Sequence, residues 1–510
     1  MRLGTRRRAG ITLAIVALVL LAIQLVVPPL VREPMARMME RSANARLDGY
    51  RLTMSAVDVS PLRFRARMRD VVLQDDDGSE PPLLRAPAAD AGLGLVGFGF
   101  RVWLAIRDPL MELDEPRRRA AAEADLVGQL LAIGPRSVQA LRRYHASLGT
   151  IDVGDAEVRW LAPAGAVSLH DVAVSLENVA RDPGRVDDPF TIDVRAKTPQ
   201  EGTIRVTGQR ALFASEPAPG IMRIALDRVA LAGLAPLADR AGLDVRRGVL
   251  TARGRVRSTV ELLDVELMNV ALSDADLAWR HTAATWTAER RALPRLTAGP
   301  RAVRVAARRV TIRRSTFAVE DANDAPPYRL FVVVDRATLR SPPADAGGES
   351  STMTLAARPM GTGAVDVDGR FRRDAGGPEV DLQLVARNVA LPAFNEALRA
   401  NGALPLEAGR FAMAIEARVR DGRIAGYAKP AFTGVEVAEQ QDAGVARELA
   451  KKVVDAVSEL LDNERGDVAT RITLSGTLPD PNVSVWEAIV GVLRNAFVEA
   501  IVPEFERVVG

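Results

Sequence analysis

The chain has 510 residues, no cysteine, a formal net charge of +3 and only 4% aromatic residues. This length allows two or more ordinary domains or one elongated domain, and the lack of cysteine excludes disulfides, a thiol nucleophile and thiolate metal ligands. Most of the basic residues are arginines, but no segment gathers them into a stripe interleaved with aromatic residues, so the composition argues against nucleic-acid binding.

The first predicted element is an apolar helix at residues 11–31, preceded by a basic cytoplasmic tail at residues 1–10. A helix of about 20 apolar residues can cross a bilayer core about 30 Å thick. Basic flanks stay on the cytoplasmic side, which places the rest of the chain outside. A cleaved signal peptide is the alternative, but the apolar run is longer than a usual h-region and residues 28–32 make a poor cleavage site. We therefore expect a retained single-pass transmembrane anchor.

Residues 32–48 have methionines at helical spacing (Met35, Met38, Met39) and are predicted to leave the membrane as a short helix. From residue 49 to residue 440, apolar and charged residues alternate in runs separated by turns rich in Gly, Pro and Asp, which predicts roughly two dozen half-buried strands in antiparallel hairpins. We expect this mainly β domain to present one apolar sheet face. The candidate residues lining that face are Phe64, Ala66, Met68, Val158, Trp160, Leu250, Ala252, Val256, Val365, Val367, Phe371, Leu382, Leu384, Met413 and Ile415.

An internal repeat lies within this β-rich domain. Residues 229–256 and 389–419 each contain Val-Ala-Leu, a short helix, a stopping glycine, a second glycine and a long alternating strand. The stopping glycines are Gly242 and Gly402, and the second glycines are Gly248 and Gly409. Such self-similarity suggests one unit used repeatedly in an elongated array.

Residues 441–510 are predicted to form C-terminal amphipathic helices with one strand between them. The last helix could close the end of the sheet, or it could dock on a membrane or a protein partner, and the sequence leaves both open. The candidate docking residues on this helix are Trp486, Ile489, Leu493, Phe497 and Ile501.

The predicted helices are too few to cover the apolar face of so many strands. That face must pack against another sheet, forming a β-sandwich, or remain as the dry interior of a curved trough. The periodicity of the strands does not distinguish a sandwich with a filled core from a trough whose apolar face lines an open groove.

Three sequence features could carry chemistry, and each has a simpler interpretation. The string GLGLVG at residues 92–97 resembles a dinucleotide fingerprint but lacks the strand–turn–helix context, so we interpret it as a glycine-rich strand or bend. The acidic run at residues 75–78 lacks calcium-ligand spacing and is predicted to be a turn. The histidines His145, His170 and His281 are far apart in sequence. We therefore predict no catalytic, cofactor-binding or metal-binding residue and no enzymatic activity.

Five stretches resemble AsmA-like proteins of the bacterial envelope, in particular a branch of long uncharacterised members. They are residues 50–73, residues 149–160, the Val-Ala-Leu repeats, residues 422–430 and residues 475–481. The resemblance implies an inner-membrane anchor and a periplasmic β-rich trough. It also implies a role in moving phospholipid between membranes or in maintaining the outer membrane. The alternative is a structural or assembly factor with a filled β-sandwich core, in which the C-terminal helices or exposed strand edges would bind an envelope protein.

Overall fold

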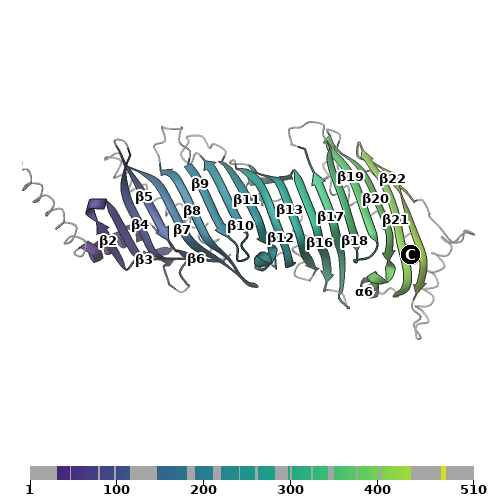
Figure 1. The fold of residues 1–510 in the computed structure, drawn as a ribbon, viewed down its shortest axis with the longest axis horizontal. Helices are drawn as coiled ribbons and strands as arrows, with labels where there is room; N and C mark the ends of the chain where they lie inside the picture. Colours follow the sequence, from purple (N-terminus) through teal and green to yellow (C-terminus); the bar gives the residue numbers. More distant parts are fainter. Residues whose placement is uncertain are drawn as a thin grey trace, which may run out of the picture. The chain divides into compact units, whose positions relative to one another are not determined.

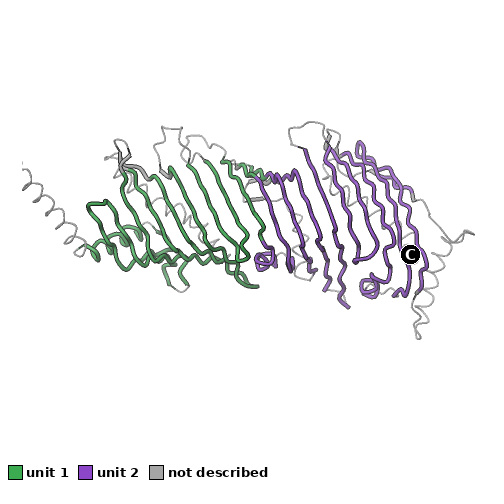
Figure 2. Tube along the Cα trace, in the orientation of Figure 1, with its two compact units in different colours: residues 1–229, 255–265, 297–304 green, residues 230–254, 266–296, 305–510 purple. Residues whose placement is uncertain are grey.

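The computed structural model describes residues 31–45, 47–78, 81–96, 99–114, 146–180, 190–210, 220–239, 242–258, 262–281, 297–298, 301–322, 326–342, 350–374, 377–400, 405–437 and 472–477. The chain divides into two compact units (Figure 2). Unit 1 comprises Met1–Val229, Arg255–Val265 and Thr297–Arg304, and unit 2 comprises Ala230–Gly254, Glu266–Leu296 and Val305–Gly510.

The described residues are mainly β, with few and short helices (Figure 1), as the alternating sequence pattern predicts. Residues 31–44 form a helix where the membrane-exit helix is predicted. Within the described ranges, no helix has both the length and the apolar character needed to cross a membrane. The predicted anchor, apart from Val31, and the residues Trp486, Ile489, Leu493, Phe497 and Ile501 lie outside the described residues.

The strands of unit 1 form one mixed sheet. Strand β3 pairs with both β1 and β2, and the ladder then runs β3–β4–β5–β7–β8–β9–β10–β11. The β5–β7 and β6–β7 pairs are parallel, which a chain of simple hairpins would not produce. The elements are β1 (Tyr50–Thr53), β2 (Ala56–Ser60), η1 (Pro61–Arg63), β3 (Arg65–Asp75), β4 (Leu84–Val96), β5 (Gly99–Arg107), β6 (Leu110–Asp114), β7 (Ala146–Ala162), β8 (Gly165–Ala180), β9 (Phe190–Lys197), β10 (Thr203–Arg210) and β11 (Gly220–Ala230).

Unit 2 also contains a mixed sheet. β13 pairs in parallel with β16, and the ladder then runs from β16 to β23 through consecutive antiparallel pairs. Strands β11, β12, β13 and β15 have residues in both units. The remaining elements are η2 (Leu231–Leu234), α4 (Ala235–Ala238), β12 (Leu243–Ser258), β13 (Leu262–His281), β14 (Thr297–Ala298), β15 (Arg301–Ala307), β16 (Arg309–Asp321), β17 (Tyr328–Arg340), β18 (Ser351–Pro359), β19 (Ala364–Asp374), β20 (Gly377–Ala390), η4 (Leu391–Phe394), α6 (Asn395–Ala400), β21 (Leu406–Arg420), β22 (Arg423–Val437) and β23 (Ile472–Thr477).

The two copies of the predicted internal repeat share one order of elements, and Gly402, the stopping glycine of the second copy, lies outside the described residues. The first copy runs β11–η2–α4–β12 and the second runs β20–η4–α6–β21. Gly248 (φ +142°) and Gly409 (φ +134°) occupy equivalent places, and a Cβ on either would lie within about 3 Å of the leucine that opens its copy's 3-10 turn, Leu231 Cδ1 at 3.1 Å or Leu391 Cδ1 at 3.0 Å. The second glycine of each copy is therefore needed both for its backbone conformation and for close packing of the turn.

Three sequence expectations about local structure can be compared directly with the fold. Phe64 was expected on the apolar face of a strand, but β3 begins only at Arg65 and Phe64 ends the η1 turn with φ +46°. Pro61 at the first position of η1 explains the difference, because proline fixes φ for a turn and cannot donate to the ladder. Gly92 and Gly94 lie within β4, as the strand interpretation predicts. The acidic run follows the end of β3 as a turn, also as predicted.

Candidate apolar binding face

A continuous row of aliphatic side chains crosses the sheet of unit 1. Directly registered residues on neighbouring strands project on the same face, so the ladder identifies which side chains lie side by side. We call the following nine residues, one from each of nine strands, the unit 1 row: Val57, Met68, Ala89, Ile106, Val153, Val174, Val194, Val206 and Ile224.

Unit 2 contains an equivalent row. It also has one residue from each of nine strands, and every member is Leu, Ile, Val or Ala. We call these residues the unit 2 row: Leu272, Ile312, Ala337, Leu355, Val367, Leu384, Ile415, Ala428 and Ile472.

Each row has a covered stretch and a partly open stretch. In unit 1 the first three residues, on β2, β3 and β4, are 0–8% exposed, and Ala36 of the helix at residues 31–44 belongs to the same core cluster. From Ile106 on β5 to Ile224 on β11, every member is only partly buried. In unit 2, Leu272 to Leu355 are partly buried, whereas Ile415 and Ala428 are 1% and 0% exposed. Aliphatic surface is therefore accessible over most of the unit 1 row and about half of the unit 2 row.

The opposite face of each sheet is polar. The positions next to the unit 1 row include Asp58, Arg67, Asp90, Asp152 and Asp193. The positions next to the unit 2 row are Ala271, Thr311, Thr338, Thr354, Asp368, Gln383, Glu416, Tyr427 and Thr473. One wet face and one dry face on the same strands is the arrangement that the alternating sequence predicts.

Ion pairs order the polar face of unit 1 most tightly around Asp90, which is only 3% exposed. Arg67 Nε donates to Asp90 Oδ1 at 2.8 Å, and an Arg65 guanidinium nitrogen donates to Oδ2 at 2.6 Å. The hydrogen bond from Arg67 lowers the pKa of Asp90 below its usual value, burial opposes this, and Arg65 lowers the pKa further. The carboxylate therefore remains ionised and paired beneath the apolar row.

Bulges interrupt the ladders at polar residues. Register shifts occur between Val153 and Ala156 on β7, between Val334 and Arg336 on β17, and between Ala386 and Val389 on β20. Asp155 (φ +55°) and Asn388 (φ +52°) lie inside two of these shifts. Because a bulge bends its strand and increases the local twist, the sheet bends at these places within each unit.

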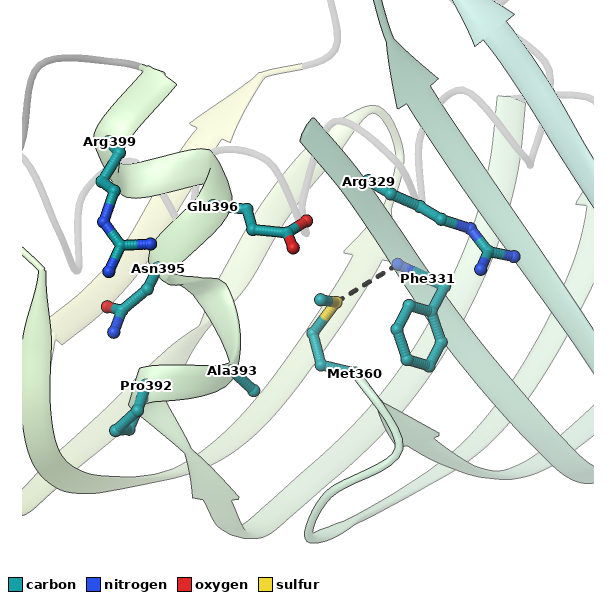
Figure 3. Close-up of a pocket in the computed structure, with 8 residues that line it drawn as sticks. All are labelled: Arg329, Phe331, Met360, Pro392, Ala393, Asn395, Glu396 and Arg399. Carbon is teal, nitrogen blue, oxygen red and sulfur yellow. Dashed lines mark hydrogen bonds between the residues drawn. The ribbon is translucent and has the colours of Figure 1, made fainter. Parts of the chain in front are cut away.

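A polar pocket lies beside the second copy of the repeat (Figure 3). It has a volume of about 550 Å³, and it lies between α6, η4 and the beginning of β17. Arg329 on its wall pairs with Glu320 at 3.2 Å and Asp276 at 3.4 Å, while Glu396 projects from α6 toward β17. The pocket mixes two arginines with a glutamate, so its charges favour neither sign of ligand. Its lining residues are Arg329, Phe331, Met360, Pro392, Ala393, Asn395, Glu396 and Arg399.

The structure brings several of the predicted groove residues together. Val367, Leu384 and Ile415 are consecutive members of the unit 2 row. Val365, Phe371, Leu382 and Met413 belong to the same cluster on β19, β20 and β21. In unit 1, Met68 belongs to the row, Ala66 lies on the same face, and Val158 and Trp160 lie further along β7, opposite Leu169 and Val167. On β12, Leu250 is partly buried, whereas Ala252 and Val256 are 9% and 7% exposed.

Phe64 is the exception among the predicted groove residues. It is 62% exposed and lies in the turn before β3, outside the apolar face.

Much of the accessible part of both rows was not predicted from the sequence. Val194, Val206 and Ile224 lie in short alternating strands of unit 1, and Ile312 and Leu355 lie in similar strands of unit 2. The same alternation would have identified each strand. The register that aligns them became visible only in the structure.

No protein-family model matches the chain. No curated protein matches it either.

Proposed function

We propose that the chain carries lipid, with acyl chains lying on the aliphatic rows and the polar head group remaining in water. The observation that supports this proposal is the accessible aliphatic surface from β5 to β11 of unit 1 and from β13 to β18 of unit 2. A folded protein rarely leaves contiguous apolar surface open unless something binds there.

The dimensions of a row suit an acyl chain. Strands lie about 4.8 Å apart, so nine strands carry a row across about 38 Å, more than twice the depth of about 15 Å of one bilayer leaflet. Each CH₂ group withdrawn from water contributes about 0.8 kcal/mol, so an aliphatic surface lowers the cost of moving an acyl chain outside a bilayer. Small aliphatic side chains impose little shape selection, which favours tolerance for different acyl chains.

The sequence supports the cellular setting of this proposal. The apolar segment at residues 11–31 and the resemblance to AsmA-like proteins favour an inner-membrane anchor with the sheet in the periplasm. In that setting the cargo is phospholipid moving between the two membranes, and the effect is to maintain the outer membrane. No catalytic residue is required, and we propose that the protein is not an enzyme. The C-terminal helices are proposed to contact the membrane or an envelope protein.

Photocrosslinking in cells tests the proposal. A photoreactive residue at Val206 or Ile312 faces the apolar side, and matched controls at Thr207 and Thr311 face the polar side one residue away. We expect phospholipid to be captured at Val206 and Ile312 and not at the two threonines. Equal capture, or none, at all four positions contradicts lipid carriage.

A second function is favoured by the covered ends of the rows. Val57, Ile415 and Ala428 are at most 1% exposed, so part of the apolar face is a filled core. If the accessible part is also covered in the cell, the chain would be a structural or assembly factor whose face binds a protein. In that case the photoreactive residue at Val206 or Ile312 would capture a protein in place of lipid.

A further inference from the structure

The turn between β2 and β3 exposes two large apolar side chains at its tip. It consists of η1 (Pro61–Arg63) and Phe64, and we call it the hairpin tip. The side chain of Phe64 is 62% exposed and that of Leu62 is 45% exposed. Arg63 lies between them and is also exposed. The tip therefore presents an apolar–basic–apolar sequence to its surroundings.

The backbone of Phe64 makes this exposure more informative. Phe64 has φ +46° and ψ +45°, the left-handed region that bulky residues avoid at a cost of about 1–3 kcal/mol. Glycine or asparagine would satisfy the same turn with less strain. An aromatic side chain here is both strained and largely exposed to water, and it belongs to none of the apolar clusters of the described residues.

The hairpin tip lies close to the point where residues 11–30 join the described part of the chain. Arg32, at the start of the helix at residues 31–44, pairs with Asp58 of β2 at 2.5 Å. Asp58 is registered with Arg67, and Ser60 at the end of β2 is registered with Arg65. The helix start is thus held within three residues of the tip, and Ala36 of the helix packs in the same cluster as Val57.

The charges around the tip suit a phospholipid surface. Arg63 belongs to the tip and Arg41 is exposed on the helix, as is Arg37, which pairs with the exposed Glu33. Exposed aromatic and aliphatic groups flanked by arginines are the composition of protein segments that lie in the bilayer interface.

We infer that the hairpin tip inserts Leu62 and Phe64 into the surface of the membrane that holds residues 11–31, with Arg63 at the phosphate level. This inference rests on the proposed function for the placement of residues 11–31 in a membrane. Its consequence for that function is specific. Val57, the first member of the unit 1 row, lies on the same hairpin as the tip, so the covered end of the row would lie at the bilayer surface, and its accessible part would begin three strands further on, at Ile106.

The lack of cysteine in the chain allows a clean labelling experiment. The full chain is reconstituted into nanodiscs of phosphatidylethanolamine and phosphatidylglycerol. A single environment-sensitive fluorophore is attached at L20C, L62C, F64C or I221C. Ile221 is the matched control, because it is 43% exposed but lies on β11 at the far end of the unit 1 ladder. Lipids brominated in the acyl chains quench fluorophores that enter the bilayer.

We expect emission from positions 20, 62 and 64 to shift to the blue and to be quenched by brominated lipid, and emission from position 221 to show neither change. Quenching at position 20 without quenching at 62 and 64 overturns the inference and leaves the anchor in place. If the fluorophore at position 20 is not quenched, residues 11–31 do not lie in the bilayer, and the inference that the hairpin tip inserts there is overturned as well. Lipid capture at Val206, measured separately, reports on the proposed function, so the two proposals fail in different experiments.

A second variant separates insertion from folding. Asparagine tolerates the left-handed conformation, so Phe64→Asn should keep the melting temperature while removing the aromatic group. We expect this substitution to reduce the quenching of a fluorophore at position 62. Unchanged quenching at position 62 in the Phe64→Asn protein would show that the aromatic side chain does not anchor the tip.

Discussion

The two aliphatic rows have the same construction but are covered at different places. In unit 1 the covered residues lie on β2 to β4, beneath the helix at residues 31–44, and in unit 2 they lie mainly on β19 to β22, where Phe394 of η4 packs against the cluster. The side chains themselves differ little between covered and accessible positions. Whether a position in a row is buried or accessible therefore depends on the segment that packs on it. One row can contain both core positions and surface positions.

The largest expected difference between the rows comes from placing a carboxylate in a covered and in an accessible position. Ile415→Asp would bury an unpaired charge at a site that is 1% exposed, and we expect it to lower the free energy of unfolding of unit 2 by about 4 kcal/mol. Val206→Asp, at a partly exposed site, should cost about 1 kcal/mol. Denaturant unfolding followed by circular dichroism measures both. Equal losses would mean that the two rows are buried alike.

The polar faces provide a second contrast, because Asp90 of unit 1 is buried whereas Asp368 of unit 2 is exposed. Asp90→Asn removes charge-assisted hydrogen bonds to Arg65 and Arg67 and should cost about 2 kcal/mol at pH 7. Asp368→Asn should leave the unfolding midpoint unchanged.

The paired state of Asp90 also predicts a dependence on pH. The pKa of Asp90 is lower in the folded chain than in the unfolded chain, so its stabilisation is complete above the unfolded value of about 4 and is lost as the pH falls through the folded value. Between pH 7 and pH 2, the free energy of unfolding should therefore fall more steeply with decreasing pH for the parent chain than for Asp90→Asn. Parallel curves would show that Asp90 is not the group that titrates.

The two copies of the repeat can be compared within unit 2. Gly248→Ala and Gly409→Ala each introduce a Cβ at positive φ about 3 Å from a leucine methyl group, and each should lower the free energy of unfolding by about 1–2 kcal/mol. Gly248→Ala should cost more, because its Cβ meets the backbone Cα of Ala275 at 3.0 Å, whereas the nearest backbone atom at Gly409 is Val435 Cα at 3.3 Å. Gly422→Asn is the control, since its surroundings are open and asparagine tolerates φ +70°. The melting temperatures of the three variants, measured by thermal unfolding, should follow this order, with Gly248→Ala the lowest.

The smallest effect is expected from the exposed ion pair at the edge of the unit 2 row. Arg314 donates to both carboxylate oxygens of Asp274 at 2.8 Å, but both side chains are largely in water. Arg314→Ala keeps a non-glycine residue at φ +44° and so isolates the ion pair. We expect no measurable change in the midpoint of unfolding. A clear loss would indicate that the pair is shielded from solvent in the native chain.

The strands could be predicted from the sequence, but their pairing register could not. Alternation predicted roughly two dozen strands, and the described residues contain 23. It failed at Phe64, because Arg63-Phe64-Arg65 alternates like a strand while Pro61 imposes a turn. Alternation also cannot show that β5 and β7 pair in parallel, or that Ile106 and Val153 are neighbours, since register depends on bulges and connections far apart in sequence. For the same reason the sequence identified Ile415 and Val367 as apolar-face residues but not the rows that contain them.

The order of the ladders has a consequence for how the chain is made. From β7 to β11 and from β16 to β22, each strand pairs with the strand that immediately precedes it in the sequence. Short loops close such pairs at low entropic cost. A chain emerging N-terminus first from the ribosome can therefore add one strand at a time to the growing edge, and no strand in these stretches has to wait for a distant partner to be synthesised.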